Sequence, residues 1–264
     1  MGKLVSVAQD EKQLSYYKYF ETGLPEIPAE KLALAAEPQP VGRGIPFDRK
    51  DDFILMPEDK NYCFVGFGVN EDGTAYAANQ TFVPGGTPEM LDWWFSWAGI
   101  GPDLRYRIWD PEDHYYSKIV ESERMYDESI PMRERIWGIR NWVLEDIGMG
   151  PMEIFLHFKN PIDFGFSKEL VWQPGAEAVV CGGGMPACVC HKARKVEGGI
   201  MIDSYFWVGY FCDEQRQLCK LDPAQSPMPL AVAARALYGH NLREMGKLAE
   251  ILPSLYAEES VKPL

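Results

Sequence analysis

The sequence contains no apolar run long enough to cross a membrane. Its longest candidate, from Ala178 to Cys190, is interrupted by three glycines and a proline, whereas a span needs about 18 consecutive apolar residues. Basic residues are also in the minority, with 26 Lys and Arg against 39 Asp and Glu and a net charge of −13. This charge would repel a phosphate backbone and an anionic membrane surface. We therefore expect neither a nucleic acid nor a membrane as a partner.

Several common enzyme motifs are missing as well. The sequence has no G-x-S-x-G, which excludes the commonest serine-hydrolase pattern, and its glycine run 182–184 lacks the flanking residues of a phosphate loop. The first twenty residues carry charges and have no apolar segment of the kind found in secretion signals. We therefore expect a cytoplasmic protein, in which the six cysteines are free thiols or ligands rather than disulfides.

The length and composition predict one folded domain. The chain has 264 residues, of which 46% are hydrophobic and 13% aromatic, enough for a substantial buried core. Its eight Trp residues favour a cavity for a flat apolar ligand, although ordinary core packing would also use them. Because no linker or repeat divides the sequence, we expect a single domain over residues 51–264, preceded by a helical lead-in over residues 1–50.

Short apolar runs separated by turns predict a sheet-rich domain. Helices are expected over 3–23, over 29–36 and from Pro88 through the Trp-rich segment. The longest helix is expected from Pro229 to about Leu252, ending at Pro253. Strands are expected at 62–69, 74–83, 104–109, 137–146, 152–159, 176–181, 187–196 and 199–212. Many strands followed by one long C-terminal helix indicate an α+β domain whose antiparallel sheet wraps that helix.

Two ionisable residues interrupt the apolar face of the C-terminal helix. His240 and Glu244 share this face with apolar residues at positions 230, 233, 237, 248 and 251. Burying an imidazole and a carboxylate without partners costs several kcal/mol, so the pair either faces solvent or has a strong partner. Side chains at i and i+4 project in the same direction and could bind one ion, and a surface His–Glu pair is the alternative. Lys247 lies off this line and is expected at the surface.

Two further residues could complete a metal site. His114 follows a predicted strand in a loop of prolines and acidic residues, where an ordinary loop histidine is the alternative. Glu145 alternates with Val143 and Asn141 on one strand face, so an inward carboxylate there would need a partner. Two His and two Glu side chains would form a set of two nitrogens and two oxygens that suits tetrahedral Zn²⁺ or a somewhat larger divalent ion.

A competing metal site would use Cys181, Cys188, Cys190 and His191. Its spacing lacks the paired C-x₂₋₄-C knuckles of structural zinc sites. Cys188 and Cys190 would share one strand face while His191 points to the other, so ordinary strand packing is the favoured interpretation. His191 could still line a cavity, whereas His157 is expected to be a structural residue.

Four segments resemble one known family. They are RYRIWDPEDH (105–114), VLEDIGMGPMEIFLHFKNP (143–161), YFWVGY (205–210) and HNLREMGKLAEILP (240–253). In order and spacing they resemble the zinc-dependent carbon–carbon hydrolases that include diacetylphloroglucinol hydrolase and phloretin hydrolase. The resemblance covers roughly residues 50–255. It implies a helix-grip fold like that of the major birch-pollen allergen (Bet v 1-like), and one Zn²⁺ per chain bound by His114, Glu145, His240 and Glu244.

The resemblance also implies which residues contact the substrate. Tyr106 falls where one substrate-contacting Tyr is expected, and His191 is the counterpart of a His that acts on phenolic hydroxyls by general acid–base catalysis. For a second Tyr the YFW segment offers Tyr205, with Phe206 as the alternative position, in which case this contact is missing.

The implied activity is hydrolysis of the aryl–acyl carbon–carbon bond of an acylphloroglucinol. Phloretin, cleaved to phloroglucinol and phloretic acid, is the favoured substrate because the chain has many Trp and Tyr residues. A diacetylphloroglucinol-type deacetylase is one alternative, and a metal enzyme of the same fold acting on another β-diketone-like substrate is a second. A non-catalytic helix-grip protein that binds a flat hydrophobic ligand is the third. A homodimer would be an ordinary state for such a protein.

Overall fold

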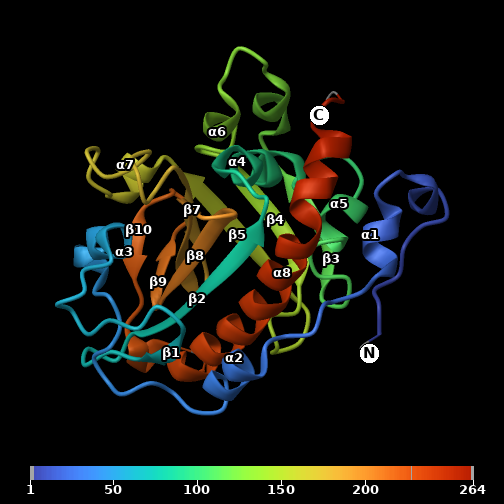
Figure 1. Cartoon of the computed structure of the whole chain (residues 1–264). Coiled ribbons are helices and arrows are strands. Elements are labelled where there is room, and N and C mark those ends of the chain that lie inside the picture. Colours follow the sequence, from blue (N-terminus) through green and yellow to red (C-terminus); the bar gives the residue numbers. More distant parts are fainter. Residues whose placement is uncertain (1–2, 227, 263–264) are drawn as a thin grey trace.

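A large antiparallel sheet organises the molecule. The computed structural model describes residues 3–226 and 228–262. Within these residues one sheet has eight strands in the order β1-β2-β8-β7-β6-β5-β4-β3, and a second sheet pairs β10 with β9 (Figure 1). The strands are β1 (Gly66–Val69), β2 (Ala75–Pro84), β3 (His114–Ile119), β4 (Arg140–Glu145), β5 (Met152–Lys159), β6 (Ala178–Gly184), β7 (Ala187–Val196), β8 (Gly199–Val208), β9 (Tyr210–Cys212) and β10 (Leu218–Lys220).

One long helix and several short ones accompany the sheet. The α-helices are α1 (Tyr17–Glu21), α2 (Ala29–Leu34), α3 (Asp51–Leu55), α4 (Pro88–Trp97), α5 (Leu104–Arg107), α6 (Met132–Arg135), α7 (Pro161–Phe164) and α8 (Leu230–Glu259). Single 3₁₀ turns are η1 (Glu11–Gln13), η2 (Phe47–Arg49), η3 (Ser122–Tyr126) and η4 (Pro223–Gln225).

Helix α8 covers one face of the sheet. It packs on β1, β2 and β8, while α4 packs on β6 and β7 and also contacts α8 (Figure 1). The apolar residues of α8 that share the predicted face are buried, with Leu237 and Leu248 at 7% and 0% exposure. Each large apolar side chain buried in this way contributes about 1.5–3 kcal/mol. The expected α+β architecture, a large antiparallel sheet with a C-terminal helix, is confirmed.

The two faces of the sheet carry different cores because successive strand residues point in opposite directions. On β8, Ile202 and Phe206 join the main core beneath α8 and α4. Their neighbours Tyr205 and Trp207 join a second apolar cluster on the opposite face. Helix α3, which carries Phe53, and the segments around Ile45 and Phe164 contribute to that second cluster. The alternation on β8 therefore decides which residues can reach a site under α8.

The C-terminal helix is longer than the sequence predicts. It continues through Pro253 to Glu259, although a proline inside a helix removes one hydrogen bond and costs about 3 kcal/mol. Contacts beyond the proline offset this cost. Tyr256 packs edge-on against Trp93 of α4, and Glu259 accepts a hydrogen bond of 2.6 Å from the hydroxyl of Ser15.

The prediction of a strand over residues 104–109 is wrong. They form the single-turn helix α5 and its C-cap. Alternating Leu104, Tyr106 and Ile108 imitate strand periodicity, but tertiary contacts select the helical turn, because the backbone N–H of Leu104 donates to the carboxylate of Glu11. The strand actually begins later, at His114.

The N-terminal lead-in is less helical than expected. Over residues 3–23 the structure has η1 and α1 rather than one continuous helix. This segment is held by contacts with the main body, because Glu11 forms an ion pair of 2.7 Å with Arg107 and the ring of Tyr16 packs against Trp97. Further along, Lys18 pairs with Glu258 of α8 at 2.7 Å. Tertiary contacts therefore override the local helical preference of the segment.

Lys247 is a further correction. Its side chain is 0% exposed instead of lying at the surface, and its ammonium donates to Thr22 and to Glu250. The lead-in therefore packs over a side of α8 that its sequence alone leaves polar.

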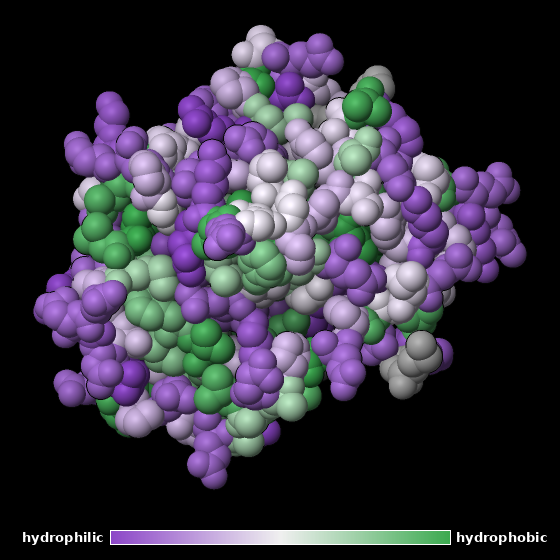
Figure 2. Space-filling view, viewed as in Figure 1, coloured by the Kyte–Doolittle hydropathy of each residue, from purple (hydrophilic) through white to green (hydrophobic). Residues whose placement is uncertain are grey.

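The cysteines and the outer surface follow the sequence. All six cysteines are free thiols. Hydrophilic side chains project all around the face shown in Figure 2 and interrupt its hydrophobic patches. Among the described residues, no helix combines the length and apolarity needed to cross a membrane.

Candidate active site

A cavity lies between the sheet, α4 and α8. Its walls are mostly apolar, and the polar residues that line it are Tyr106, Ser117, Asn141, Glu145, His191, His240 and Glu244. Of the eight Trp residues, Trp109 lines the cavity, whereas Trp94, Trp97 and Trp207 are fully buried elsewhere in the cores. A largely apolar pocket with a few convergent polar groups is the usual form of a small-molecule site.

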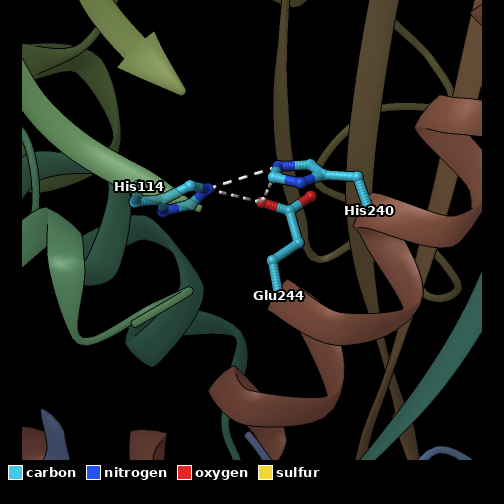
Figure 3. Close-up of side chains that lie close together, drawn as sticks. All are labelled: His114, His240 and Glu244. Atoms are coloured by element: carbon cyan, nitrogen blue, oxygen red, sulfur yellow. Dashed lines mark hydrogen bonds and ion pairs between the residues drawn. The ribbon is translucent and has the colours of Figure 1, made fainter. Parts of the chain in front are cut away.

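Two histidines face each other beside this cavity, and His240 of the pair lines it. His114 opens β3 and His240 lies on α8, and their Nε2 atoms are 3.2 Å apart (Figure 3). Nδ1 of His114 lies 3.2 Å from the carbonyl oxygen of Tyr106. Because a carbonyl only accepts, Nδ1 carries the proton and Nε2 of His114 presents a lone pair. Two buried ring nitrogens at this distance are the arrangement expected of ligands that share a cation.

Glu244 joins this pair from the next turn of α8. Its Oε2 lies 3.8 Å from Nε2 of His240 and 4.0 Å from Nε2 of His114 (Figure 3). These three side chains form a group of metal-ligand type, and all three are buried. The predicted i, i+4 pair on α8 therefore faces inward, and its alternative, an exposed His–Glu pair, is wrong.

Glu145 approaches His114 from β4. The strand register places it opposite His114, and its Oε2 lies 3.6 Å from Nε2 of His114. The hydroxyl of Tyr106 donates a hydrogen bond to the same oxygen. Glu145 is not part of the tight three-residue group, but the strand pairing brings it to the edge of that group.

Burial controls the charges of these groups. It raises the pKa of Glu244 to about 7 and lowers the pKa of His114 to about 4, so His114 is neutral at pH 7. For His240, burial alone would lower the pKa, but the carboxylates of Glu244 and Glu145 outweigh it and raise the pKa. Two carboxylates and two imidazoles gathered without solvent are costly unless a cation compensates the negative charge.

The donor set fits a divalent cation. Two ligands that each lie about 2.0–2.2 Å from a tetrahedral ion are roughly 3.3–3.6 Å apart, close to the separations of 3.2 to 4.0 Å between His114, His240 and Glu244. Two imidazole nitrogens and carboxylate oxygens are ligands that Zn²⁺ accepts. Among residues 3–226 and 228–262, the groups spaced for a metal ion contain no cysteine.

An acidic group behind His240 is a feature that the sequence reasoning missed. Asp110 is fully buried, and its Oδ2 lies 3.9 Å from Nδ1 of His240. Asp110 and Asp113 both form ion pairs with the guanidinium of Arg243. Asp110, Asp113 and His240 are also spaced closely enough to hold a cation, but the guanidinium of Arg243 already compensates one of the two carboxylate charges there. The sequence feature that could have indicated this acidic group is Arg243, a cation three residues after His240 on α8.

Tyr106 and His191 both line the cavity. The ring of Tyr106 stacks on His114 with centroids 4.0 Å apart and planes 5° from parallel. His191 points to the cavity face of β7 as expected, and its Nδ1 lies 2.8 Å from the hydroxyl oxygen of Ser204. Cys188 and Cys190 belong to the cluster on the opposite face, so the interpretation of these cysteines as strand packing is confirmed.

Tyr205 does not reach the cavity. It is 0% exposed in the second cluster, where its hydroxyl oxygen accepts a hydrogen bond of 2.6 Å from the backbone N–H of Ile45. The period of two along β8 places Phe206 at the cavity wall instead. The structure therefore places Tyr205 away from the cavity, and Phe206, the alternative position, lines the cavity without a hydroxyl.

Replacing Tyr205 by phenylalanine should weaken the fold without altering substrate binding. The variant leaves the buried N–H of Ile45 without its acceptor, which costs about 1–3 kcal/mol. Chemical denaturation should show this loss of stability, while KM at a temperature where the variant is folded stays at the wild-type value. A raised KM in fully folded Tyr205→Phe protein would contradict the assignment to the second cluster.

Comparison with known proteins gives a consistent result. A family model described as the DAPG hydrolase PhiG domain matches residues 45–257. Phloretin hydrolase of Eubacterium ramulus is 43% identical over 262 residues, which cover 98% of this chain and 95% of that protein. The 2,4-diacetylphloroglucinol hydrolases of a Pseudomonas species and of Pseudomonas protegens are each 26% identical over 209 residues, or 73% of this chain and 70% and 67% of theirs. The chain belongs to the DAPG hydrolase family.

Proposed function

We propose that the protein is a metal-dependent hydrolase that cleaves the aryl–acyl carbon–carbon bond of acylphloroglucinols, converting phloretin to phloroglucinol and phloretic acid. The observation that carries this proposal is the buried group of His114, His240 and Glu244, of which His240 and Glu244 line a mostly apolar cavity. The higher identity to phloretin hydrolase than to the diacetylphloroglucinol hydrolases supports phloretin as the substrate.

In this proposal one Zn²⁺ is bound by His114, Glu145, His240 and Glu244. The donor types and the separations among His114, His240 and Glu244 support this set of ligands. The strand register supports the inclusion of Glu145. When bound, the ion would supply a Lewis acid and a water molecule of lowered pKa.

The side chains around the ion have distinct tasks in hydrolysis. The oxygen of water ends on the acyl carbon, and the electron pair of the broken bond stays with the ring carbon, which takes a proton. Burial, followed by the nearby Glu145 carboxylate, raises the pKa of Tyr106 well above its usual range, so its phenol remains a proton donor. Burial lowers the pKa of His191 to about 3, so its imidazole is neutral and offers a ring nitrogen that can accept a hydrogen bond from a phenolic hydroxyl.

The enclosed cavity is on the scale of a single ring. Its volume is about 100 Å³, below that of an apolar cavity of about 150 Å³ that holds benzene. The enclosed part therefore takes at most one ring, and in this proposal the rest of the substrate extends toward the opening. Met185 lines the cavity and is 44% exposed, which marks the opening.

The proposal also covers the finer description of the fold. We assign the curved sheet and α8 to the helix-grip (Bet v 1-like) class. We treat residues 51–264 as the catalytic domain and residues 1–50 as a lead-in packed on it. The contacts of Glu11 and Lys18 with the main body support this division.

Product analysis tests the function directly. Purified protein loaded with Zn²⁺ is incubated with phloretin, and the products are quantified over time by chromatography. We expect phloroglucinol and phloretic acid to form in equal amounts. Diacetylphloroglucinol is run in parallel, and we expect the lower kcat/KM for it. Tight binding of phloretin without any product would refute the hydrolase and favour a binding protein.

Replacing Tyr106 by phenylalanine should slow turnover by roughly 10²-fold, the usual scale of general acid–base help. The ring and its stacking on His114 remain, so Zn²⁺ stoichiometry at saturating metal should stay at one per chain. Steady-state kinetics and elemental analysis measure the two effects.

Tyr116→Phe is the matched control for this variant. It removes a tyrosine hydroxyl that bonds to Glu153 in an exposed position, and it should leave kcat unchanged. Wild-type turnover in Tyr106→Phe would assign Tyr106 to packing and leave His191 as the proton-transfer group.

A further inference from the structure

A line of buried amides leads away from Glu244. Its Oε1 accepts a hydrogen bond of 2.9 Å from Nδ2 of Asn241, which lies one turn earlier on α8. The amide oxygen of Asn241 accepts one of 3.1 Å from Nδ2 of Asn79 on β2. Asn79 and Asn241 are 2% and 0% exposed. Neither amide therefore has water as an alternative partner.

The line ends at an ammonium group from the lead-in. Lys31 of α2 donates a hydrogen bond of 2.9 Å to the amide oxygen of Asn79 and a second one to the carbonyl of Gln80. The remaining N–H of the Asn79 amide donates to the hydroxyl of Thr81 at 3.1 Å. Every polar atom of the Asn79 side chain thus has a partner.

Lys31 determines the direction of the whole line. An amide can turn round and exchange its donor and acceptor ends, but an ammonium group only donates. With Lys31 in place, the oxygen of Asn79 must face it, so the NH₂ of Asn79 must face Asn241. The oxygen of Asn241 then accepts a hydrogen bond from Asn79, so the NH₂ of Asn241 must point at Glu244. Without Lys31, the Asn79 amide could reverse, and Asn241 could then reverse with it and present its oxygen to the carboxylate of Glu244.

This orientation matters for the metal centre. Asn241 occupies Oε1 of Glu244 and leaves Oε2 as the oxygen that faces His240 and His114. Groups that hold a ligand from behind typically change metal affinity or activity by 10–100-fold when they are removed. Their effect is strongest in a buried network in which all partners are satisfied.

We propose that a network formed by Lys31, Asn79 and Asn241, here called the Lys31 network, positions Glu244 for metal binding. Through Lys31 the N-terminal lead-in then contributes to the active site. This inference rests on the proposed metal centre. Lys31 lies outside residues 45–257, which match the family model. The residues that bind the ion therefore depend on a segment that the family model does not include.

The test measures Zn²⁺ affinity of the full chain without any substrate. Metal-free wild-type protein and Lys31→Met are titrated against a chelating dye that competes for Zn²⁺. We expect the Kd of Lys31→Met to rise about 10-fold, at the low end of the range for such groups. Lys31→Arg retains a donor-only cation, so it should restore the Kd to within about 3-fold of wild type.

Lys18→Met is the matched control. Lys18 also links the lead-in to α8, through Glu258 at 2.7 Å, but it lies outside the Lys31 network. It should leave the Kd unchanged even if both variants lower the melting temperature. An unchanged Kd in Lys31→Met, or equal losses in Lys31→Met and Lys18→Met, would overturn the inference while the metal centre stands. A wild-type protein without stoichiometric Zn²⁺ would overturn the proposed metal centre and this inference with it.

Discussion

Replacing His240 by alanine is expected to abolish stoichiometric zinc binding and to reduce turnover by roughly 10³-fold or more. His240 lies close to both other members of the group of metal-ligand type, because its Nε2 is 3.2 Å from Nε2 of His114 and 3.8 Å from Oε2 of Glu244. Its loss removes a nitrogen ligand and leaves the carboxylate of Glu244 without its closest imidazole. A bound metal supplies several kcal/mol of transition-state stabilisation, and each 1.4 kcal/mol is about tenfold in rate.

Elemental analysis after desalting, together with steady-state kinetics on phloretin, measures both losses. The control must lie on α8 and at the surface, which excludes the buried Lys247. Ser254→Ala meets both conditions, and it should retain one Zn²⁺ per chain and wild-type turnover. If His240→Ala protein were active with no bound metal, the metal-dependent mechanism would have to be abandoned.

The strong periodicities in the sequence predict the architecture well. Strands β2, β5 and β7 lie within one residue of their predicted limits, because each alternates or is bounded by turns. The long C-terminal helix is predicted by its apolar face, but its end is not. A proline normally stops a helix, and here the packing of Tyr256 on Trp93 outweighs that local rule. Such a contact between distant segments leaves no local trace in the sequence.

Most members of the group of metal-ligand type were predictable for a similar reason. Spacing on one helix places His240 and Glu244 side by side, and inward polarity on a strand singles out Glu145. Their meeting with His114 was not predictable from periodicity, because the strand that begins at His114 was missed. The β3–β4 pairing, with His114 opposite Glu145, is the tertiary fact that joins the two halves of the site.

The misplacement of Tyr205 comes from the choice of strand face. A shift of one residue reverses which side chains face the cavity, and this separates Tyr205 from Phe206 on β8. The supporting residues Asp110, Asn79 and Asn241 were missed because their roles depend on partners far away in sequence. Asn241 bonds to Asn79 across 162 positions, and no local pattern indicates such a pair.

Removing the three hydroxyls from the acyl-bearing ring of the substrate should lower kcat/KM by up to about 10⁴-fold. Two effects of the hydroxyls coincide. Hydroxyls ortho and para to the acyl group donate electrons to the ring carbon that, in the proposed reaction, is protonated before the bond breaks. The cavity also holds Tyr106 and His191 among mainly apolar walls, so an unhydroxylated ring leaves buried polar groups unpaired, which is the source of discrimination on this scale.

The measurement compares kcat/KM for phloretin with kcat/KM for an analogue in which the ring that bears the acyl group carries no hydroxyls. Both values come from product formation at substrate concentrations well below KM. Competition of the analogue against phloretin gives its binding separately, so a loss in the chemical step can be distinguished from a loss in affinity. If the two ketones were cleaved at comparable rates, protonation of the ring carbon could not be a required step. Cleavage of esters alone would refute carbon–carbon hydrolysis altogether, because an ester releases its alcohol without a proton on carbon.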